Sequence, residues 1–222
     1  MTAVSQILPS NAPTSPAAPT SPIDDLGTIG VRMTFGPGEE IYVQDEDADM
    51  IYRVVRGAVR TSRLLSDGRR QVGDFYYPGD FIGLEAGPTH RFSAEALGVC
   101  EIQVIRKAAL KVCGEEGVRI ERMIWSGTVR ELQRTQEHLL LLGRKSACEK
   151  VASFLLDMAR RFRGQVAELP MGRQDMADYL GLTIETVSRM VTQLQADGLV
   201  RFQGCRRFEV RNPAGLAHLV EA

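Results

Sequence analysis

The sequence predicts an α+β protein in three parts: an N-terminal antiparallel β-roll of the jelly-roll kind, one long helix, and a C-terminal winged helix-turn-helix. Residues 28–116 hold many short alternating runs separated by Gly and Pro turns, which is typical of an antiparallel roll. Residues 117–145 repeat apolar side chains at steps of three and four, as a helix in a coiled coil does. Residues 146–222 contain two helices around Gly181 and a basic hairpin, the order found in DNA-binding winged helices.

The segment before the roll, residues 1–27, is expected to be a disordered tail. Five prolines interrupt Ser, Thr and Ala there, and few side chains could form a core. The first basic residue is Arg32, so the positive start of a signal peptide is missing. No apolar run approaches the roughly 20 residues that cross a bilayer. We therefore expect a cytoplasmic protein with no membrane partner.

The β-roll is predicted from its turns. Residues 51–60 alternate like paired strands, and Asp67-Gly68 is a strong hairpin turn. Further turn sequences occur at residues 35–38, 77–80 and 87–88. Strands this short, joined by such turns, favour an antiparallel roll over a parallel sheet.

The long helix carries one predicted dimer seam. At about 1.5 Å per residue, residues 117–145 would extend about 40 Å. The seam residues alternate steps of three and four, and they are Trp125, Thr128, Leu132, Thr135, Leu139 and Leu142. Such a repeat predicts a homodimer through a parallel helix pair. The alternative is an amphipathic helix that packs only on its own domain. A further apolar helix is expected over residues 148–161.

We call the predicted winged helix-turn-helix of residues 146–222 the reader. The first helix of its helix-turn-helix is expected over residues 174–180, in which small Ala177 allows close packing. Gly181 suits the left-handed turn position, and Thr183 can cap the next helix. That helix should end at Gly198. Its predicted buried stripe is Ile184, Val187, Val191 and Leu194, at steps of three and four.

The opposite side of the same helix carries Glu185, Ser188, Arg189 and Thr192. A carboxylate can accept from the cytosine amino group, and a guanidinium can donate twice to guanine. The same guanidinium can also clamp a phosphate. This polar, forked face predicts a recognition helix whose side chains suit base edges. The alternative is an ordinary helical subdomain whose charged side chains face solvent.

A basic wing should follow, made of residues 199–203 and 206–210 around Gly204-Cys205. The alternative is a solvated hairpin with no nucleic-acid role. The residues expected to contact the DNA backbone are Arg173, Thr183, Thr186, Thr192, Arg206 and Arg207. Overall charge does not suggest such a partner: residues 1–145 have 17 basic and 19 acidic side chains (−2), and residues 146–222 have 10 and 9 (+1).

Four scattered cysteines, Cys100, Cys113, Cys148 and Cys205, show no C-x-x-C spacing, so free thiols are expected rather than disulfides or a metal site. Cys205 lies at the predicted wing tip beside Arg206 and Arg207, whose charge favours the thiolate. It is either an oxidation-sensitive residue near the DNA backbone or an incidental turn residue.

Residues 169–183 and the Glu185-x-x-Ser188-Arg189 motif resemble the CRP/FNR regulators, in particular the FixK branch, and the resemblance extends from about residue 28 to the C-terminus. It implies a cyclic-nucleotide-binding type of β-roll. It further implies a homodimeric transcription activator that works with RNA polymerase on a palindrome with TTGAT-like half-sites. It implies low-oxygen or nitrogen-fixation genes as targets, and Glu185, Ser188 and Arg189 as the base-reading residues.

The chain departs from the ligand-sensing members of that family. Arg91 and Ser93 are out of register with the Arg-Ser pair that holds a cyclic phosphate, and Glu95 is expected to add negative charge there. No cysteine precedes Cys100, so an N-terminal iron–sulfur cluster is not expected. The three histidines show no haem pattern. We therefore expect no cofactor; the alternative is a ligand-gated regulator with an unrecognised small effector in the roll. No nucleophile–base pair, metal spacing or phosphate loop suggests an enzyme.

Overall fold

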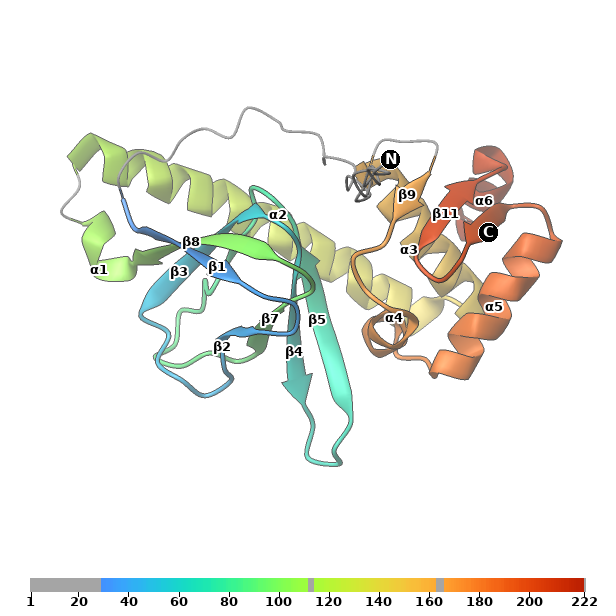
Figure 1. Ribbon diagram of the computed structural model, residues 1–222, viewed down its shortest axis with the longest axis horizontal. Coiled ribbons are helices and arrows are strands. Elements are labelled where there is room, and N and C mark those ends of the chain that lie inside the picture. Colours follow the sequence, from blue (N-terminus) through green and yellow to red (C-terminus); the bar gives the residue numbers. More distant parts are fainter. Residues whose placement is uncertain (1–28, 112–113, 163–165, 222) are drawn as a thin grey trace, which may run out of the picture.

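The computed structural model describes residues 29–111, 114–162 and 166–221. A β-roll, a long helix and a C-terminal α/β unit follow in chain order (Figure 1). The tail predicted over residues 1–27 lies outside the described residues.

The β-roll consists of two four-stranded sheets that pack around one core. Every strand pair in it is antiparallel, with orders β1-β8-β3-β6 and β2-β7-β4-β5. The strands are β1 (Val31–Phe35), β2 (Glu40–Tyr42), β3 (Met50–Arg56), β4 (Val59–Leu64), β5 (Arg70–Tyr76), β6 (Phe81–Ile82), β7 (Ser93–Ala96) and β8 (Cys100–Arg106). Val54, Val59 and Ile102 are fully buried between the sheets. The predicted antiparallel roll is confirmed, and Gly68 takes a positive φ of 82° in the hairpin turn between β4 and β5.

The alternation predicted over residues 51–60 is wrong for β3. Five consecutive residues of this strand are buried instead of every second one. The reason is that both faces of β3 are covered. Ile51 packs with Ile105 and with Ile120 of the long helix, on the face away from the roll core. A strand covered on both sides has no solvent face, so it loses the period of two.

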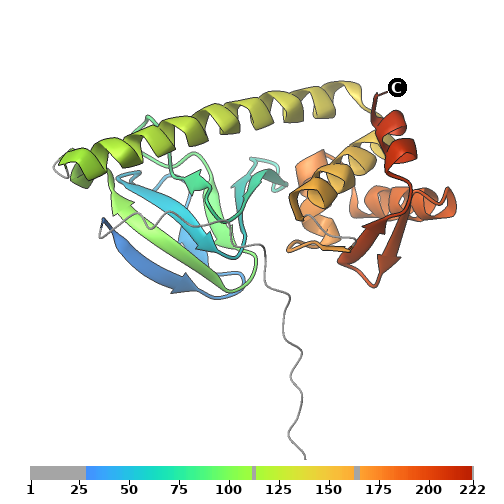
Figure 2. The same ribbon diagram turned by 90° about the horizontal axis from the view of Figure 1, so that it is seen from above.

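Helix α2 (Gly114–Arg144) spans the molecule from the roll to the C-terminal unit (Figure 2). It follows the short α1 (Lys107–Leu110) and begins at Gly114, before the predicted start at residue 117. Glu115 and Glu116 lie in its first turn, where carboxylates interact favourably with the helix dipole. Its 31 residues extend about 46 Å at 1.5 Å each, which is long enough to contact both domains.

The C-terminal unit is a winged helix-turn-helix with one strand and one helix more than predicted. Its elements are α3 (Ala147–Phe162), β9 (Ala167–Glu168), α4 (Arg173–Leu180), α5 (Ile184–Ala196), β10 (Val200–Gln203), β11 (Arg207–Val210) and α6 (Pro213–Glu221). Strand β9 pairs with β11 and makes the wing a three-stranded sheet in the order β10-β11-β9. Two residues are too few to show any periodicity, so the sequence could not predict β9.

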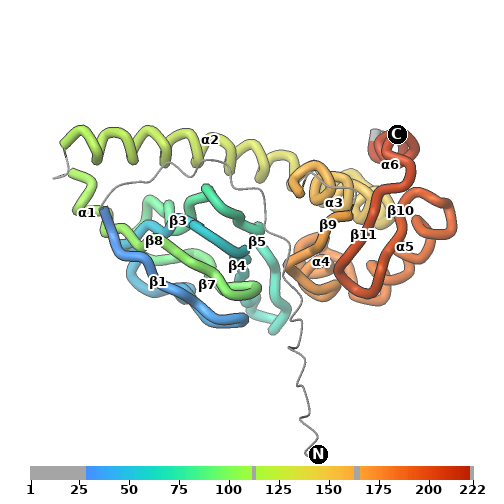
Figure 3. The backbone as a smooth tube through the Cα atoms, turned by 45° about the horizontal axis from the view of Figure 1, so that its top comes forward, coloured from blue at the N-terminus to red at the C-terminus, as the bar shows by residue number. Residues whose placement is uncertain are grey.

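The C-terminal unit packs directly on the roll. The Phe75 ring of β5 lies 5.3 Å from Tyr179 of α4 and 6.2 Å from Phe154 of α3, between centroids. Two residues further along the chain, the Tyr77 hydroxyl donates to the Met158 sulfur at 3.3 Å. These contacts join roll and reader in one buried cluster. In Figures 1 and 3, α4 lies between β5 and α5, so α5 occupies the far side of the unit from the roll.

Asp74 of β5 lies beside this junction, and Arg134 of α2 approaches it with Nε 3.3 Å from Oδ2. Burial raises the pKa of Asp74 to about 6, although the Arg134 charge opposes the rise. Arg134 also donates to Asp80 at 3.3 Å. Ionising Asp74 therefore costs more in the folded protein than in the unfolded chain.

We expect Asp74→Asn to remove a pH-dependent loss of stability. As pH rises above the ordinary value of 3.8, the unfolded chain releases this proton first, so the free energy of unfolding falls until about pH 6. The loss is on the order of 2–3 kcal/mol and persists at higher pH. Denaturant unfolding of both proteins between about pH 4.5 and pH 8 should show the advantage of Asp74→Asn growing with pH. A difference independent of pH would contradict the assignment.

Candidate nucleic-acid interface

The turn between α4 and α5 has the geometry that its residues predict. Gly181 adopts the left-handed conformation with φ 61°, and its N–H donates to the Ala177 carbonyl. The Thr183 hydroxyl accepts from the Thr186 N–H at 3.2 Å and so caps α5. Both the glycine turn and the threonine cap are confirmed.

Helix α5 packs through one side. Val187, Val191 and Leu194 are at most 1% exposed, as the predicted stripe requires. Ile184 is 38% exposed, so its assignment to the buried stripe is wrong. It is the first residue of α5, at the margin of the domain core, where the periodicity of the helix no longer guarantees a neighbour.

The opposite side of α5 brings the three predicted base readers together. Glu185 and Arg189 are exposed and Ser188 is half-buried. Arg189 Nη2 donates to the Thr186 hydroxyl at 3.4 Å. Hydrogen bonds from its own backbone N–H and from Thr183 hold the pKa of Glu185 below its ordinary value. The face therefore presents an ionised acceptor beside a forked donor, the two chemistries that distinguish C·G from G·C in the major groove.

The residues predicted to contact the DNA backbone lie on α4, on α5 and in the wing, and several of them also make contacts within the protein. The Thr192 hydroxyl donates to the Ser188 carbonyl at 3.0 Å. The guanidinium of half-buried Arg173 lies 5.5 Å from the centroid of the Phe202 ring in the wing. Arg206 and Arg207 are exposed at the wing tip, and Arg207 Nε is 3.9 Å from a Glu168 carboxylate oxygen. Their contact with phosphate stays a prediction.

The predicted dimer seam forms an exposed stripe on α2. Trp125, Leu132 and Leu139 are 71%, 59% and 70% exposed. Thr128 and Thr135 lie between them, and each hydroxyl donates to the carbonyl four residues earlier in the helix. Leu142 differs, because it is half-buried and a β-carbon at Gly181 would come within 3.6 Å of its Cδ2. Surface this apolar on a helix is typical of a face that a partner covers.

A second repeat on α2 contacts the C-terminal unit. Gly127, Glu131, Arg134, His138 and Leu141 also alternate steps of four and three, on the side of the helix that neighbours the seam. His138 stacks on the Tyr179 ring with centroids 3.9 Å apart, and its Nε2 donates to the Tyr179 carbonyl at 2.9 Å. Burial lowers the pKa of His138. This repeat was the sequence signal that could have identified α2 as a brace for α4.

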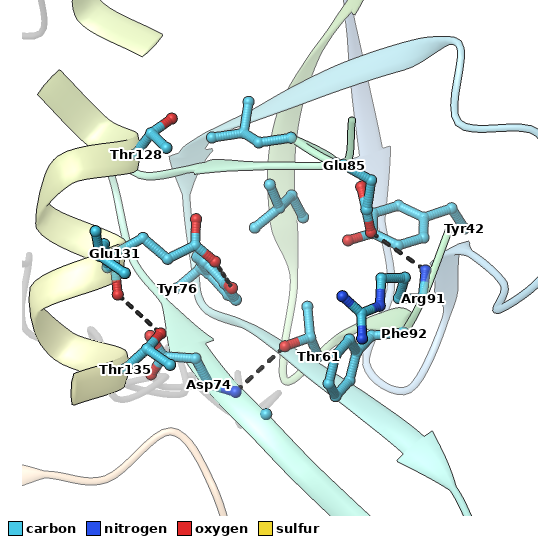
Figure 4. A pocket seen from close by; sticks show the side chains of 15 residues that line it. Tyr42, Thr61, Asp74, Tyr76, Glu85, Arg91, Phe92, Thr128, Glu131 and Thr135 are labelled. Carbon is cyan, nitrogen blue, oxygen red and sulfur yellow. Dashed lines mark hydrogen bonds between the residues drawn. The ribbon is translucent and has the colours of Figure 1, made fainter. Parts of the chain in front are cut away.

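A cavity of about 400 Å³ opens between the roll and α2 (Figure 4). Arg91 lines it, but Ser93 and Glu95 do not: Ser93 accepts from the Gln44 N–H at 3.0 Å, and Glu95 binds Arg60. The expectation that Glu95 would repel an anion here is therefore wrong. The negative charge comes from three other lining residues, Asp74, Glu85 and Glu131.

Each of these carboxylates is engaged within the protein. Glu131 accepts from the Tyr76 hydroxyl at 2.7 Å, and Glu85 is 3.2 Å from His90 Nδ1. A cyclic phosphate in this cavity would meet three carboxylates and one guanidinium, and the net negative charge disfavours its binding.

None of the helices among residues 29–111, 114–162 and 166–221 combines the length and the hydropathy of a transmembrane span. The same residues contain no group of three or more His, Cys, Asp or Glu side chains arranged to bind a metal ion.

The chain matches two family models: a cyclic nucleotide-binding domain over residues 32–116 and a Crp-like helix-turn-helix domain over residues 149–219. It is 43% identical over 204 residues to the nitrogen fixation regulation protein FixK of Azorhizobium caulinodans, covering 89% of this chain and 82% of the relative. It is 44% identical to FixK of Rhizobium meliloti over 84% of this chain and 85% of that protein.

Among solved structures, FixK2 from Bradyrhizobium japonicum superposes with a TM-score of 0.81 at 45% identity, covering 87% of this chain and 98% of the other. The relatives are transcription regulators rather than enzymes, as expected. Together with the recognition face on α5, the β-roll and the bridging helix, these matches show that the chain belongs to the CRP/FNR superfamily of transcription regulators, in its FixK-like branch.

Proposed function

We propose that this regulator is a homodimeric transcription activator that binds a palindrome with TTGAT-like half-sites without a small-molecule effector. Glu185, Ser188 and Arg189 read the bases. The relatives named for regulation of nitrogen fixation support targets among low-oxygen or nitrogen-fixation genes. Activation requires contact with RNA polymerase. Because DNA and RNA polymerase are both in the cytoplasm of a bacterium, the protein is expected to act there.

The observation that carries the proposal is the exposed face of α5. Glu185 and Arg189 lie on the one side of the helix that packs against nothing within the described chain. The wing arginines Arg206 and Arg207 are exposed on the same C-terminal unit, and phosphates flank a major groove. A reader of this kind recognises a short half-site, so a palindrome needs two copies.

Support for the dimer comes from the exposed stripe of α2. Two stripes pairing in parallel would bury Trp125, Leu132 and Leu139 and place both readers at the same end of the helix pair. That arrangement has the two-fold symmetry of a palindrome.

Selection on random duplexes with purified full-length protein and no added nucleotide tests the proposal. We expect a TTGAT-containing palindrome with half-site centres about one helical turn apart. Binding should be nanomolar, with two protomers per duplex in sedimentation. Recovery of single half-sites, or binding only after a cellular extract is added, would contradict it.

A second candidate function is ligand gating through the β-roll cavity. Its specific support is that Thr128, Leu132 and Thr135 of the stripe also line the cavity, so an occupant would contact the dimer seam. Operator binding by protein that has been unfolded and refolded to remove small molecules distinguishes the two functions. Gating requires the ligand-free form to bind poorly, so tight binding by the refolded protein would exclude it.

Cys205 carries the proposed sensitivity to oxidation. It is exposed at the wing tip beside Arg206, whereas Cys100 is buried and Cys148 half-buried; Cys113 lies outside the described residues. Hydrogen peroxide would oxidise the Cys205 sulfur to sulfenic and then sulfinic acid, being itself reduced to water, and the charge of the sulfinate would repel phosphate. Peroxide should weaken operator binding by wild type and leave Cys205→Ser unaffected, with Cys148→Ser as the matched control. Equal sensitivity of wild type and Cys205→Ser would make Cys205 an incidental turn residue.

A further inference from the structure

Five charged residues form a cluster where the roll meets the reader. We call it the interdomain latch, and its members are Arg60 of β4, Arg70 of β5, Glu95 of β7, and Asp175 and Asp178 of α4. The ion pairs between the roll and α4 join residues 105 to 115 positions apart in the chain, and Arg60 and Glu95 pair within the roll. The latch is separate from the recognition face, because it lies on α4, on the side that meets β5.

The latch is built from shared hydrogen bonds rather than isolated pairs. Arg70 Nε and Nη2 both donate to Asp178 Oδ2, at 2.8 and 2.6 Å. Arg70 Nη2 also donates to Asp175 Oδ1 at 2.8 Å. Arg60 donates to the same Asp175 oxygen, and its Nη2 contacts both Glu95 oxygens at 2.7 Å. One carboxylate of the reader is thus held by two guanidiniums of the roll.

These groups are largely withdrawn from water. The Arg60, Asp175 and Asp178 side chains are 13%, 11% and 13% exposed, and those of Arg70 and Glu95 are 29% and 27% exposed. Asp175 also accepts from the Gly172 N–H at 3.2 Å, which ties the latch to the start of α4. Planar guanidiniums held at this burial impose direction on their partners, unlike exposed ion pairs, which rearrange freely.

Apolar contacts around the latch provide attraction without direction. Phe75 and Tyr179 pack across the junction, but aromatic packing tolerates small rotations of one body on another. The latch fixes the orientation of α4 relative to the roll, which the ring contacts alone do not. Asp175 and Asp178 can both keep their hydrogen bonds to Arg60 and Arg70 only when α4 holds one angle to β4 and β5. Because residues 181–183 are a connection of only three residues between α4 and α5, that setting also fixes the direction of the recognition helix.

From this geometry we infer that Arg60 and Arg70 are positioning residues for half-site spacing. In the proposed dimer, pairing of the α2 helices fixes the position of each roll relative to the other. The latch then fixes the orientation of each reader relative to its roll. The separation between the two recognition helices then follows. A rigid pair of readers accepts one spacing of half-sites, whereas readers that swing accept several. The inference rests on the proposed dimeric operator binding.

The test measures affinity for operators whose half-site centres are moved by about one or two base pairs from the selected spacing. Wild type should lose at least about tenfold in affinity at displaced spacings. Arg70→Asp leaves two buried carboxylates facing a third, so it should weaken binding at the selected spacing by about tenfold or more. Its affinities across all spacings should fall within about threefold of one another.

The charge swap is the decisive arm. Arg70→Asp combined with Asp178→Arg should restore both affinity and spacing preference to within about threefold of wild type. Arg63→Asp is the matched control, because Arg63 lies on the same hairpin, is exposed, and undergoes the same change of charge. It should keep wild-type preference. Where Arg70→Asp does not fold, Arg70→Gln and Asp178→Asn take the same measurements.

Two results would overturn the inference: a loss of affinity that is equal at every spacing, or a double variant as tolerant as Arg70→Asp. Either would reduce the latch to a stabilising contact with no effect on spacing. Failure of the proposed function looks different, since wild type itself would then show no dimeric, palindrome-dependent binding.

Discussion

Leu139→Glu should convert the dimer into monomers that bind the operator poorly. Leu139 is 70% exposed in the protomer and lies in the apolar stripe of α2. In a parallel pair the two substituted carboxylates would face each other without partners, which weakens dimerisation by several kcal/mol. Operator affinity should fall with it, because each monomer holds one half-site. Sedimentation and operator titration of the same preparation measure both effects.

The protomer itself should remain folded, since Leu139 packs on nothing in the roll and its loss leaves no cavity. Gln133→Glu is the matched control: it adds the same charge to an exposed position of α2 outside the seam. It should remain dimeric. A Leu139→Glu protein that sediments as wild type would show that another surface holds the dimer.

Arg189→Ala should relax base preference at one position of each half-site. If the guanidinium donates to guanine, its loss costs about 1–3 kcal/mol per half-site and makes that base pair nearly indifferent. Glu185→Ala should relax preference at the base pair whose cytosine amino group it accepts from. Repeated selection on random duplexes shows both changes directly, as altered positions in the recovered motif.

Arg206→Ala is the comparison for these two variants. An exposed wing arginine near phosphate should weaken binding to all sequences alike and lower the salt dependence, with the motif unchanged. If Arg189→Ala behaved in that way, Arg189 would be a backbone contact and the base reader would lie elsewhere on α5.

Local features of the reader could be predicted because each depends on a few neighbouring residues. A glycine was required where the backbone takes φ 61°, and a hydroxyl where α5 needs a cap. Spacing by three and four also separated Val187, Val191 and Leu194 from Glu185 and Arg189, because helical geometry alone decides which residues share a side. The prediction failed at Ile184, where the helix begins and its side meets no core.

Periodicity identifies the apolar side of an element but does not say what covers it. That limit explains β3, which is buried on both faces because α2 covers the outer one. It also explains the second repeat of α2, whose His138 contacts Tyr179 of α4. It also explains the latch. No local pattern in the sequence indicates that Arg60 and Arg70 pair with Asp175 and Asp178, which follow them by more than 100 residues.

The sequence by itself determined the order of β-roll, long helix and helix-turn-helix, the turn and cap geometry between α4 and α5, and the residues of the exposed face of α5. Helical periods and glycine conformation act over a few residues, so a local pattern contains them. Only the tertiary structure decided that β5 carries α4, that buried charges from both domains pair there, and that Glu95 faces Arg60 rather than a ligand. Such pairings depend on how two separately folded units dock, and docking is a property of complementary surfaces that no local pattern contains.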